Sequence, residues 1–235
     1  MTRDEARARA RALAAASLGR GDAGGWFEEL YRGAEGDASK IPWVDHRPNS
    51  HLVEWLERER VPGVGTALVV GCGLGDDAEE LARRGFKVTA FDLSASAIEW
   101  CKRRFPQSVV EYVACDLSAT PVVWHQAFGL VFEAFTLQAM PPEARTGGFA
   151  ALARLVAPEG RLLVVTRARE ADEPMTTLPW PLSREELRAF DEAGLHAESF
   201  EDFVDRETPP VRRFRATWWR APLPAGETSD AGRRG

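Results

Sequence analysis

Short apolar runs rich in β-branched residues alternate along the chain with segments whose apolar residues recur every three or four positions. The first pattern is typical of strands covered on both faces, and the second of amphipathic helices. Strands are predicted at residues 68–70, 87–91, 109–114, 128–135, 161–166, 196–205 and 211–220. The last two are joined by a linker too short for a crossover helix, so they are expected to be antiparallel. The pattern predicts an α/β fold with a doubly wound, mostly parallel seven-stranded sheet and a C-terminal antiparallel hairpin.

Polar capping residues and glycine or proline stops delimit the expected helices. These helices are predicted at residues 2–18, 26–31, 51–60, 76–84, 95–104, 142–156 and 184–193. The last begins at Ser183-Arg-Glu-Glu186, which has the spacing of a capping box. We divide the chain into a flexible N-terminal helix or lid (1–25), a core domain (26–221) and a disordered tail rich in Gly, Pro and charge (222–235).

Charge and cysteine content exclude several classes of protein. The formal net charge is −6 and no long basic block is present, which argues against nucleic-acid and membrane-surface partners. No apolar run approaches the ~18 residues of a membrane span. The three cysteines show no Cys-x-x-Cys spacing, which argues for a reducing, cytoplasmic location and against a metal site. The Arg-rich first 20 residues also carry acids and lack a secretory apolar segment, so an arginine-rich transit peptide is only a weaker alternative.

A glycine turn after the first sheet strand is the main candidate site. Gly71, Gly73 and Gly75 allow a sharp turn and a close approach of the backbone to a ligand. Asp92 ends the next strand, about 20 residues later, where an acid can accept hydrogen bonds from both ribose hydroxyls. Asp116 ends the third strand, where an acid can accept a bond from an adenine amino group. The strand ends share one edge of the sheet, so a nucleotide-like cofactor is predicted there.

The residues after the glycines help to choose the cofactor. A dinucleotide fingerprint requires glycine at the sixth position of the motif, where this chain has Asp76, followed by Asp77. Two carboxylates at a helix start would repel a pyrophosphate and suit a cofactor with an ammonium group. The pattern therefore favours S-adenosylmethionine over NAD. An NAD-dependent oxidoreductase remains an alternative.

These segments resemble the class I S-adenosylmethionine-dependent methyltransferases over about residues 26–220. The glycine motif is Val69-Val-Gly71-Cys-Gly73-Leu-Gly75-Asp, and the strand-end motifs are Phe91-Asp92-Leu-Ser94 and Ala114-Cys-Asp116-Leu117. The aromatic residues of a short N-terminal helix, the pair Pro42-Trp43 and the segment from Phe132 to Pro142 resemble the thiopurine, thiol and halide methyltransferase branch. The branch often has two tryptophans four apart where this chain has Phe27 and Tyr31.

The resemblance implies a set of site residues. The cofactor-binding residues implied are Tyr31, Trp43, Gly71, Cys72, Gly73, Asp92, Leu93, Asp116, Leu117 and Glu133. Glu133 is also the candidate catalytic residue, although it could instead cap a helix. Candidate substrate contacts are His46, Arg47, Phe135, Thr136, Arg167 and Trp180, and no metal ligand is expected. Cys72 is expected to be a packing residue of the turn and not a nucleophile.

The resemblance implies an SN2 methyl transfer to a small molecule, with a thiol or related soft nucleophile as the leading acceptor. Small-molecule O- or N-methylation is a second hypothesis. A protein that binds S-adenosylmethionine without turnover is a third. Methylation of a nucleic-acid amino group would predict an Asn- or Asp-Pro-Pro-aromatic turn after the fourth strand, and Glu133-Ala-Phe135-Thr136 differs from it. A monomer or weak dimer is expected.

Overall fold

A single seven-stranded sheet forms the centre of the computed structural model, which describes residues 1–175 and 178–224. The strands are β1 (Thr66–Val70), β2 (Lys87–Asp92), β3 (Glu111–Ala114), β4 (Phe128–Ala134), β5 (Val156–Arg167), β6 (His196–Val204) and β7 (Arg212–Trp219). Their order is β3-β2-β1-β4-β5-β7-β6. The first five pair in parallel, and β7 lies antiparallel between β5 and β6. The predicted fold class is confirmed.

The helices follow the predicted order. They are α1 (Arg3–Gly19), α2 (Gly25–Arg32), α3 (Ser50–Arg58), α4 (Asp76–Arg83), α5 (Ala95–Arg104), α6 (Pro142–Leu155), α7 (Arg184–Leu187) and α8 (Ala189–Glu192). The capping box at Ser183 is present, but the single helix predicted after it is wrong. The backbone N–H of Arg188 bonds the carbonyl of Glu185, only three residues back, and this tighter turn separates α7 from α8.

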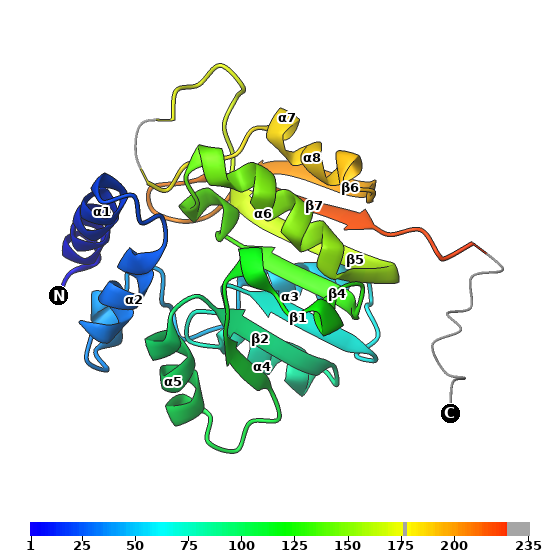
Figure 1. The fold of residues 1–235 in the computed structure, drawn as a ribbon, viewed down its shortest axis with the longest axis horizontal. Coiled ribbons are helices and arrows are strands. Elements are labelled where there is room, and N and C mark those ends of the chain that lie inside the picture. The colour runs from blue at the N-terminus through cyan, green and yellow to red at the C-terminus, as the bar shows by residue number, and fades with distance from the viewer. Residues whose placement is uncertain (176–177, 225–235) are drawn as a thin grey trace.

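Helices cover both faces of the sheet (Figure 1). On one face, Leu52, Trp55 and Leu56 of α3 pack with residues of α4 and α5 against alternate side chains of the central strands. On the other face, α6, α7 and α8 pack through residues such as Phe149 and Phe190. Burial on both faces explains why the central strands are continuous apolar runs.

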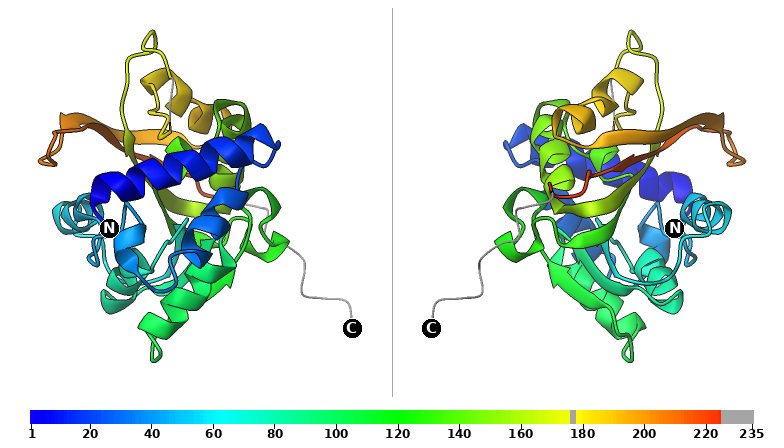
Figure 2. Two further views of the ribbon diagram at one scale, coloured as in Figure 1. Left: turned by 90° about the vertical axis from the view of Figure 1, so that its left-hand side faces the viewer. Right: turned by 90° about the vertical axis from the view of Figure 1, so that its right-hand side faces the viewer.

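The carboxyl ends of β1, β2, β3 and β4 meet at one edge of the sheet, because Val70 pairs with Phe91 and with Glu133, and Asp92 pairs with Ala114. Helices α1 and α2 lie across this edge (Figures 1 and 2). The alanine-rich side of α1 is buried, and its residues Ala10 and Ala14 belong to the same apolar cluster as Trp26 and Leu30 of α2. Most of the predicted C-terminal tail lies outside the described residues. In the described part, no helix combines the length and apolarity needed to cross a bilayer.

Candidate functional site

A cavity of about 1680 Å³ opens at the carboxyl edge of the sheet. Its walls come from α1, α2, the segment before α3, the ends of β1 to β5, and the connection between β6 and β7. Ligand pockets in proteins usually enclose about 300–1,000 Å³, so this cavity is large enough for two small molecules side by side. The cavity therefore lies at the edge of the sheet where the sequence predicts a cofactor site.

The glycine turn forms the floor of one half of the cavity. Gly71, Gly73 and Gly75 all have positive φ, at 61°, 54° and 90°. A Cβ atom on Gly71 would lie 2.3 Å from the hydroxyl of Thr136, and one on Gly75 would lie 2.5 Å from the hydroxyl of Tyr112. Side chains are therefore excluded for both conformational and steric reasons. The turn presents bare backbone to the cavity, as a closely held ligand requires.

Asp92 joins the end of β2 to this turn. Its Oδ2 accepts a hydrogen bond from the Gly73 N–H at 2.9 Å, and its Oδ1 accepts one from the Ser94 N–H at 2.9 Å. The side chain is only 6% exposed, and burial raises its pKa to about 6. Each carboxylate oxygen has two lone pairs, so each retains one that can accept a hydrogen bond from a ligand.

The end of β3 contributes the next two predicted residues. Asp116 caps a short 3-10 helix (Leu117–Ala119) by accepting a hydrogen bond from the Ser118 N–H at 2.7 Å. Asp116 is exposed, Leu117 is buried, and both line the cavity. Leu93, after β2, is largely exposed in the same cavity.

Four aromatic residues, Trp26, Phe27, Tyr31 and Trp43, form a cluster that lines the cavity, with the Tyr31 hydroxyl next to the glycine turn. Trp43 donates a hydrogen bond from Nε1 to the Tyr31 hydroxyl at 2.9 Å, and that hydroxyl lies 3.2 Å from the position of a Cβ on Gly73. Tyr31 is buried, which raises its pKa well above the ordinary value, whereas Trp43 is 39% exposed. The exposed part of the Trp43 side chain is therefore available for contact with a ligand.

The carboxylates at the start of α4 are less free than the sequence suggests. Asp76 forms a two-pronged ion pair with Arg104, with N–O distances of 2.8 and 2.9 Å. Asp77 accepts a hydrogen bond from the Asn49 N–H at 2.6 Å, and burial raises its pKa to about 6. The expected repulsion of a pyrophosphate is weakened because the charge of Asp76 is compensated.

Three of the predicted site residues do not line the cavity: Glu133, His46 and Trp180. Glu133 is completely buried, and its Oε1 accepts hydrogen bonds from the N–H groups of Thr136 at 2.6 Å and Leu137 at 2.9 Å. It therefore serves the turn after β4, the capping role that was the alternative to catalysis. His46 is exposed with a positive φ of 53°, in the segment before α3.

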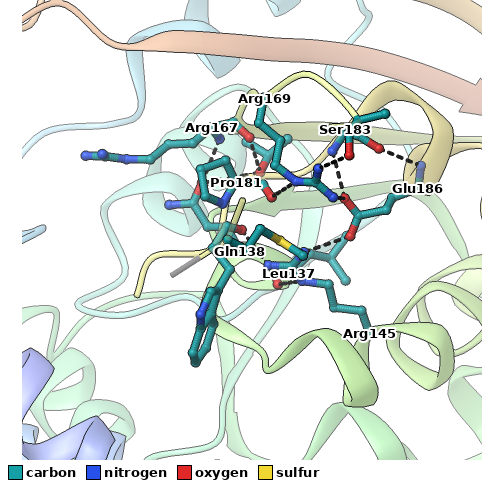
Figure 3. Close-up of polar contacts among 12 residues, drawn as sticks. Leu137, Gln138, Arg145, Arg167, Arg169, Pro181, Ser183 and Glu186 are labelled. Carbon is teal, nitrogen blue, oxygen red and sulfur yellow. Dashed lines mark hydrogen bonds and ion pairs between the residues drawn. The ribbon is translucent and has the colours of Figure 1, made fainter. Parts of the chain in front are cut away.

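A polar network around Arg145 and Glu186 holds the loop after β5 (Figure 3), and the Trp180 carbonyl is part of it. The buried Arg145 donates hydrogen bonds to the carbonyl oxygens of Leu137 and Trp180 and forms an ion pair with Glu186 at 2.8 Å. Arg169 pairs with the other oxygen of Glu186 at 2.7 Å. The network fixes one wall of the cavity through its backbone, so the Trp180 indole is not needed there.

The remaining candidates, Cys72, Arg47, Phe135, Thr136 and Arg167, all line the cavity. Cys72 is buried, and the neighbouring Cys101 thiol and burial raise its pKa well above the ordinary value. A thiol held in its protonated form is a poor nucleophile, in agreement with a packing role.

His51, Phe203 and Arg213 also line the cavity and were not predicted from the sequence. The His51 and Phe203 rings lie 5.1 Å apart, and the His51 Nδ1 is buried without a hydrogen-bond partner among the described residues. Burial and the charge of Arg213 lower the His51 pKa. No local pattern marks these positions, since they come from α3, β6 and β7. Among residues 1–175 and 178–224, no three His, Cys, Asp or Glu side chains are grouped to hold a metal ion.

The family model and the relatives found by sequence are methyltransferases. Residues 67–160 match the family described as "Methyltransferase domain". Thiocyanate methyltransferase 1 of Brassica oleracea is 27% identical over 126 residues, which cover 53% of this chain and 55% of that protein. Probable thiol methyltransferase 2 of Arabidopsis thaliana is 28% identical over 144 residues, or 60% and 61% of the two chains. The matched part thus spans less than two thirds of these relatives.

Solved structures share the fold at low identity. The 1,6-didemethyltoxoflavin-N1-methyltransferase of Burkholderia thailandensis has a TM-score of 0.64 and 19% identity, covering 83% of this chain and 85% of that one. The [4+2]-cyclase SpnF has a TM-score of 0.67 and 18% identity, covering 83% and 94%. Since a cyclase shares the fold, the fold alone does not define the reaction. The resemblance drawn from the motifs is confirmed: residues 67–160 match a methyltransferase domain, and the chain resembles the class I S-adenosylmethionine-dependent methyltransferases, the thiol methyltransferase branch among them.

Proposed function

We propose that this protein transfers a methyl group from S-adenosylmethionine to a small-molecule acceptor, with a thiol or related soft nucleophile as the preferred group. The observation that carries the proposal is the carboxylate of Asp92, held by Gly73 and Ser94 at the floor of a cavity with room for a second molecule. The methyltransferase domain and the relatives named as thiocyanate and thiol methyltransferases support it.

The polar groups at the cavity floor fit the proposed cofactor. The free lone pairs of Asp92 suit two ribose hydroxyls, and the bare backbone of the glycine turn suits the close approach of the amino-acid end. Asp116 and Leu117 are proposed to contact the adenine, and Tyr31 and Trp43 to cover the cofactor. When bound, S-adenosylmethionine supplies a methyl group activated by a sulfonium.

The chain's contribution is then mainly to position the reactants and to exclude water. Holding two reactants in line can supply about 7–11 kcal/mol of the barrier reduction as effective molarity. A thiol with a pKa near 8.5 is already a few per cent thiolate at neutral pH, so it needs little help from a base. This suits a cavity from which the candidate base Glu133 is excluded.

One observation favours the second hypothesis, methylation of an oxygen or nitrogen. His51 lines the cavity, and its lowered pKa keeps the imidazole neutral at pH 7, as a general base must be. Acceptors with O–H or N–H groups would depend on such a base more than thiols do.

Release of S-adenosylhomocysteine from S-adenosylmethionine, measured with a panel of small thiols, phenols and amines, tests the proposal. The thiols are expected to react fastest, Asp92→Asn to lose most of the activity, and the exposed surface change Asp191→Asn to retain it. Faster reaction of phenols or amines would favour the second hypothesis. Cofactor binding with no turnover of any acceptor would favour the non-catalytic one.

A further inference from the structure

We propose that Arg167 binds a carboxylate on the methyl acceptor, an inference that rests on the acceptor-binding role proposed above for this cavity. Arg167 is the last residue of β5 and lines the cavity. Side chains alternate between the faces of a strand, so Arg167 shares a face with Leu163 and Val165, which pack toward α3. The guanidinium therefore belongs to the half of the cavity between the sheet and α3.

Arg167 stands directly opposite another arginine. In the antiparallel pairing of β5 and β7 its partner is Arg213. Directly opposite side chains lie on the same face of a sheet, and like charges in such a pair are destabilising. Two facing arginines therefore need anions to compensate them.

Arg213 has its anions within the protein. Its guanidinium pairs with Asp205 and with Glu207, the latter at 2.5 Å. It also lies 4.7 Å from the centre of the Phe135 ring and is 3% exposed. The Arg213 side chain is thus held in place and its charge is compensated, so it is a fixed part of the surroundings of Arg167.

Arg167 has no such anion among the described residues. Its backbone is held, since its N–H donates to the Gln138 Oε1 at 2.6 Å and its carbonyl accepts from the Leu182 N–H at 3.0 Å. Its guanidinium makes no ion pair or hydrogen bond within residues 1–175 and 178–224, and its side chain points away from the network around Glu186 (Figure 3). Burial and the charge of Arg213 lower its pKa, and Glu207 and Asp205, which are paired with Arg213, offset this only in part. A half-buried cation without an ion-pair partner of its own is costly unless a ligand compensates it.

In the half of the cavity away from the glycine turn and Asp116, the acids of the wall are already paired with arginines. Glu54 accepts a hydrogen bond from Arg215 at 3.1 Å, and Asp45 accepts one from Arg3 at 2.8 Å. A planar guanidinium can donate two parallel hydrogen bonds to a carboxylate. The acceptor class is therefore a thiol that also carries a carboxylate.

Calorimetry on the protein saturated with S-adenosylhomocysteine tests this without turnover. The probes are 3-(methylthio)propanoate, the product of methylating a carboxylated thiol, and its uncharged methyl ester. We expect the acid to bind the wild type about tenfold or more tighter than the ester. Arg167→Gln should abolish this preference, Arg167→Lys should keep part of it, and the exposed Arg188→Gln should keep all of it. Arg167→Gln should unfold at the same temperature as wild type or higher, because it removes a like-charge pair.

Equal binding of acid and ester by wild type, or an unchanged preference in Arg167→Gln, would overturn the inference. Thiocyanate is included as a third probe. If it binds through Arg167 as tightly as the acid, the assignment of a carboxylate is wrong and the site is one for small anions. If S-adenosylhomocysteine itself does not bind, the proposed function fails. The same titrations on the ligand-free protein then still decide whether Arg167 prefers the acid.

Discussion

The carboxylate of Asp92 and the backbone N–H of Gly73 are joined by a 2.9 Å hydrogen bond. This bond links the end of β2 to the turn that follows β1, so two strand ends are held in register at the cavity floor. The same carboxylate holds Ser94, the cap of α5. A substitution at Asp92 is therefore expected to have its larger effect on ligand binding and a smaller one on the local turn.

Asp92→Asn is predicted to weaken binding of S-adenosylhomocysteine by about 10- to 100-fold, since a hydrogen bond to a charged group contributes about 1.5–3 kcal/mol. Calorimetry measures this directly. The pKa of Asp92 is about 6 in the free protein. Protonation converts an acceptor oxygen to a donor, so wild-type affinity should fall as the pH falls below about 6. The variant should not show this loss, and a wild-type affinity that is flat from pH 5 to 8 would contradict the role of Asp92.

Gly71→Ala is predicted to destabilise the protein more than Gly65→Ala, which serves as a matched control. Both glycines have positive φ, but a Cβ on Gly65 meets open space and one on Gly71 meets the Thr136 hydroxyl at 2.3 Å. The left-handed conformation alone costs about 1–2 kcal/mol for a residue with a Cβ. Urea unfolding of the two variants should show the added steric cost at Gly71. Equal free energies of unfolding would mean that the turn can relax away from Thr136.

Binding of S-adenosylhomocysteine is predicted to change the fluorescence of Trp43, because its side chain is 39% exposed, lines the cavity and is hydrogen-bonded to Tyr31. The chain has eight tryptophans, so the signal is the difference between wild type and Trp43→Phe. Trp219→Phe, at the far end of β7, should respond as wild type does. A ligand response in Trp43→Phe as large as in wild type would show that Trp43 does not cover the ligand.

Glu133→Gln is predicted to flatten the dependence of stability on pH. Burial raises the folded-state pKa of Glu133 to about 7, above its ordinary value of about 4.3. The folded state therefore holds this proton more tightly, and the contribution to stability is lost as the pH rises through 7. Glutamine keeps an oxygen for the N–H groups of Thr136 and Leu137 without a charge. Chemical unfolding from pH 5 to 8 should show a smaller loss in the variant than in wild type; parallel curves would contradict the assignment.

The fold and the cofactor half of the site were predictable because their signals are local. Continuous apolar runs identify strands buried on both faces, and three glycines followed by a strand-end acid have a fixed spacing along the chain. Gly71, Gly73 and Asp92 lie together because parallel strands place their carboxyl ends at one edge.

The acceptor half could not be predicted in the same way, because its contacts join distant segments. Glu133 lies near the end of an apolar strand, a position typical of a catalytic group. Its buried carboxylate instead accepts hydrogen bonds from the N–H groups of Thr136 and Leu137. Arg104 compensates Asp76 across 28 residues, and Arg213 faces Arg167 only because β7 inserts between β5 and β6. Such pairings depend on strand order, which local periodicity does not determine.

The most direct test of the central claim is calorimetric titration of the wild-type protein with S-adenosylhomocysteine and, separately, with NAD. The site built on Gly73 and Asp92, together with the methyltransferase domain match, predicts saturable binding of S-adenosylhomocysteine at one site per chain and much weaker binding of NAD. Absence of S-adenosylhomocysteine binding, or tight NAD binding that S-adenosylhomocysteine does not displace, would contradict it.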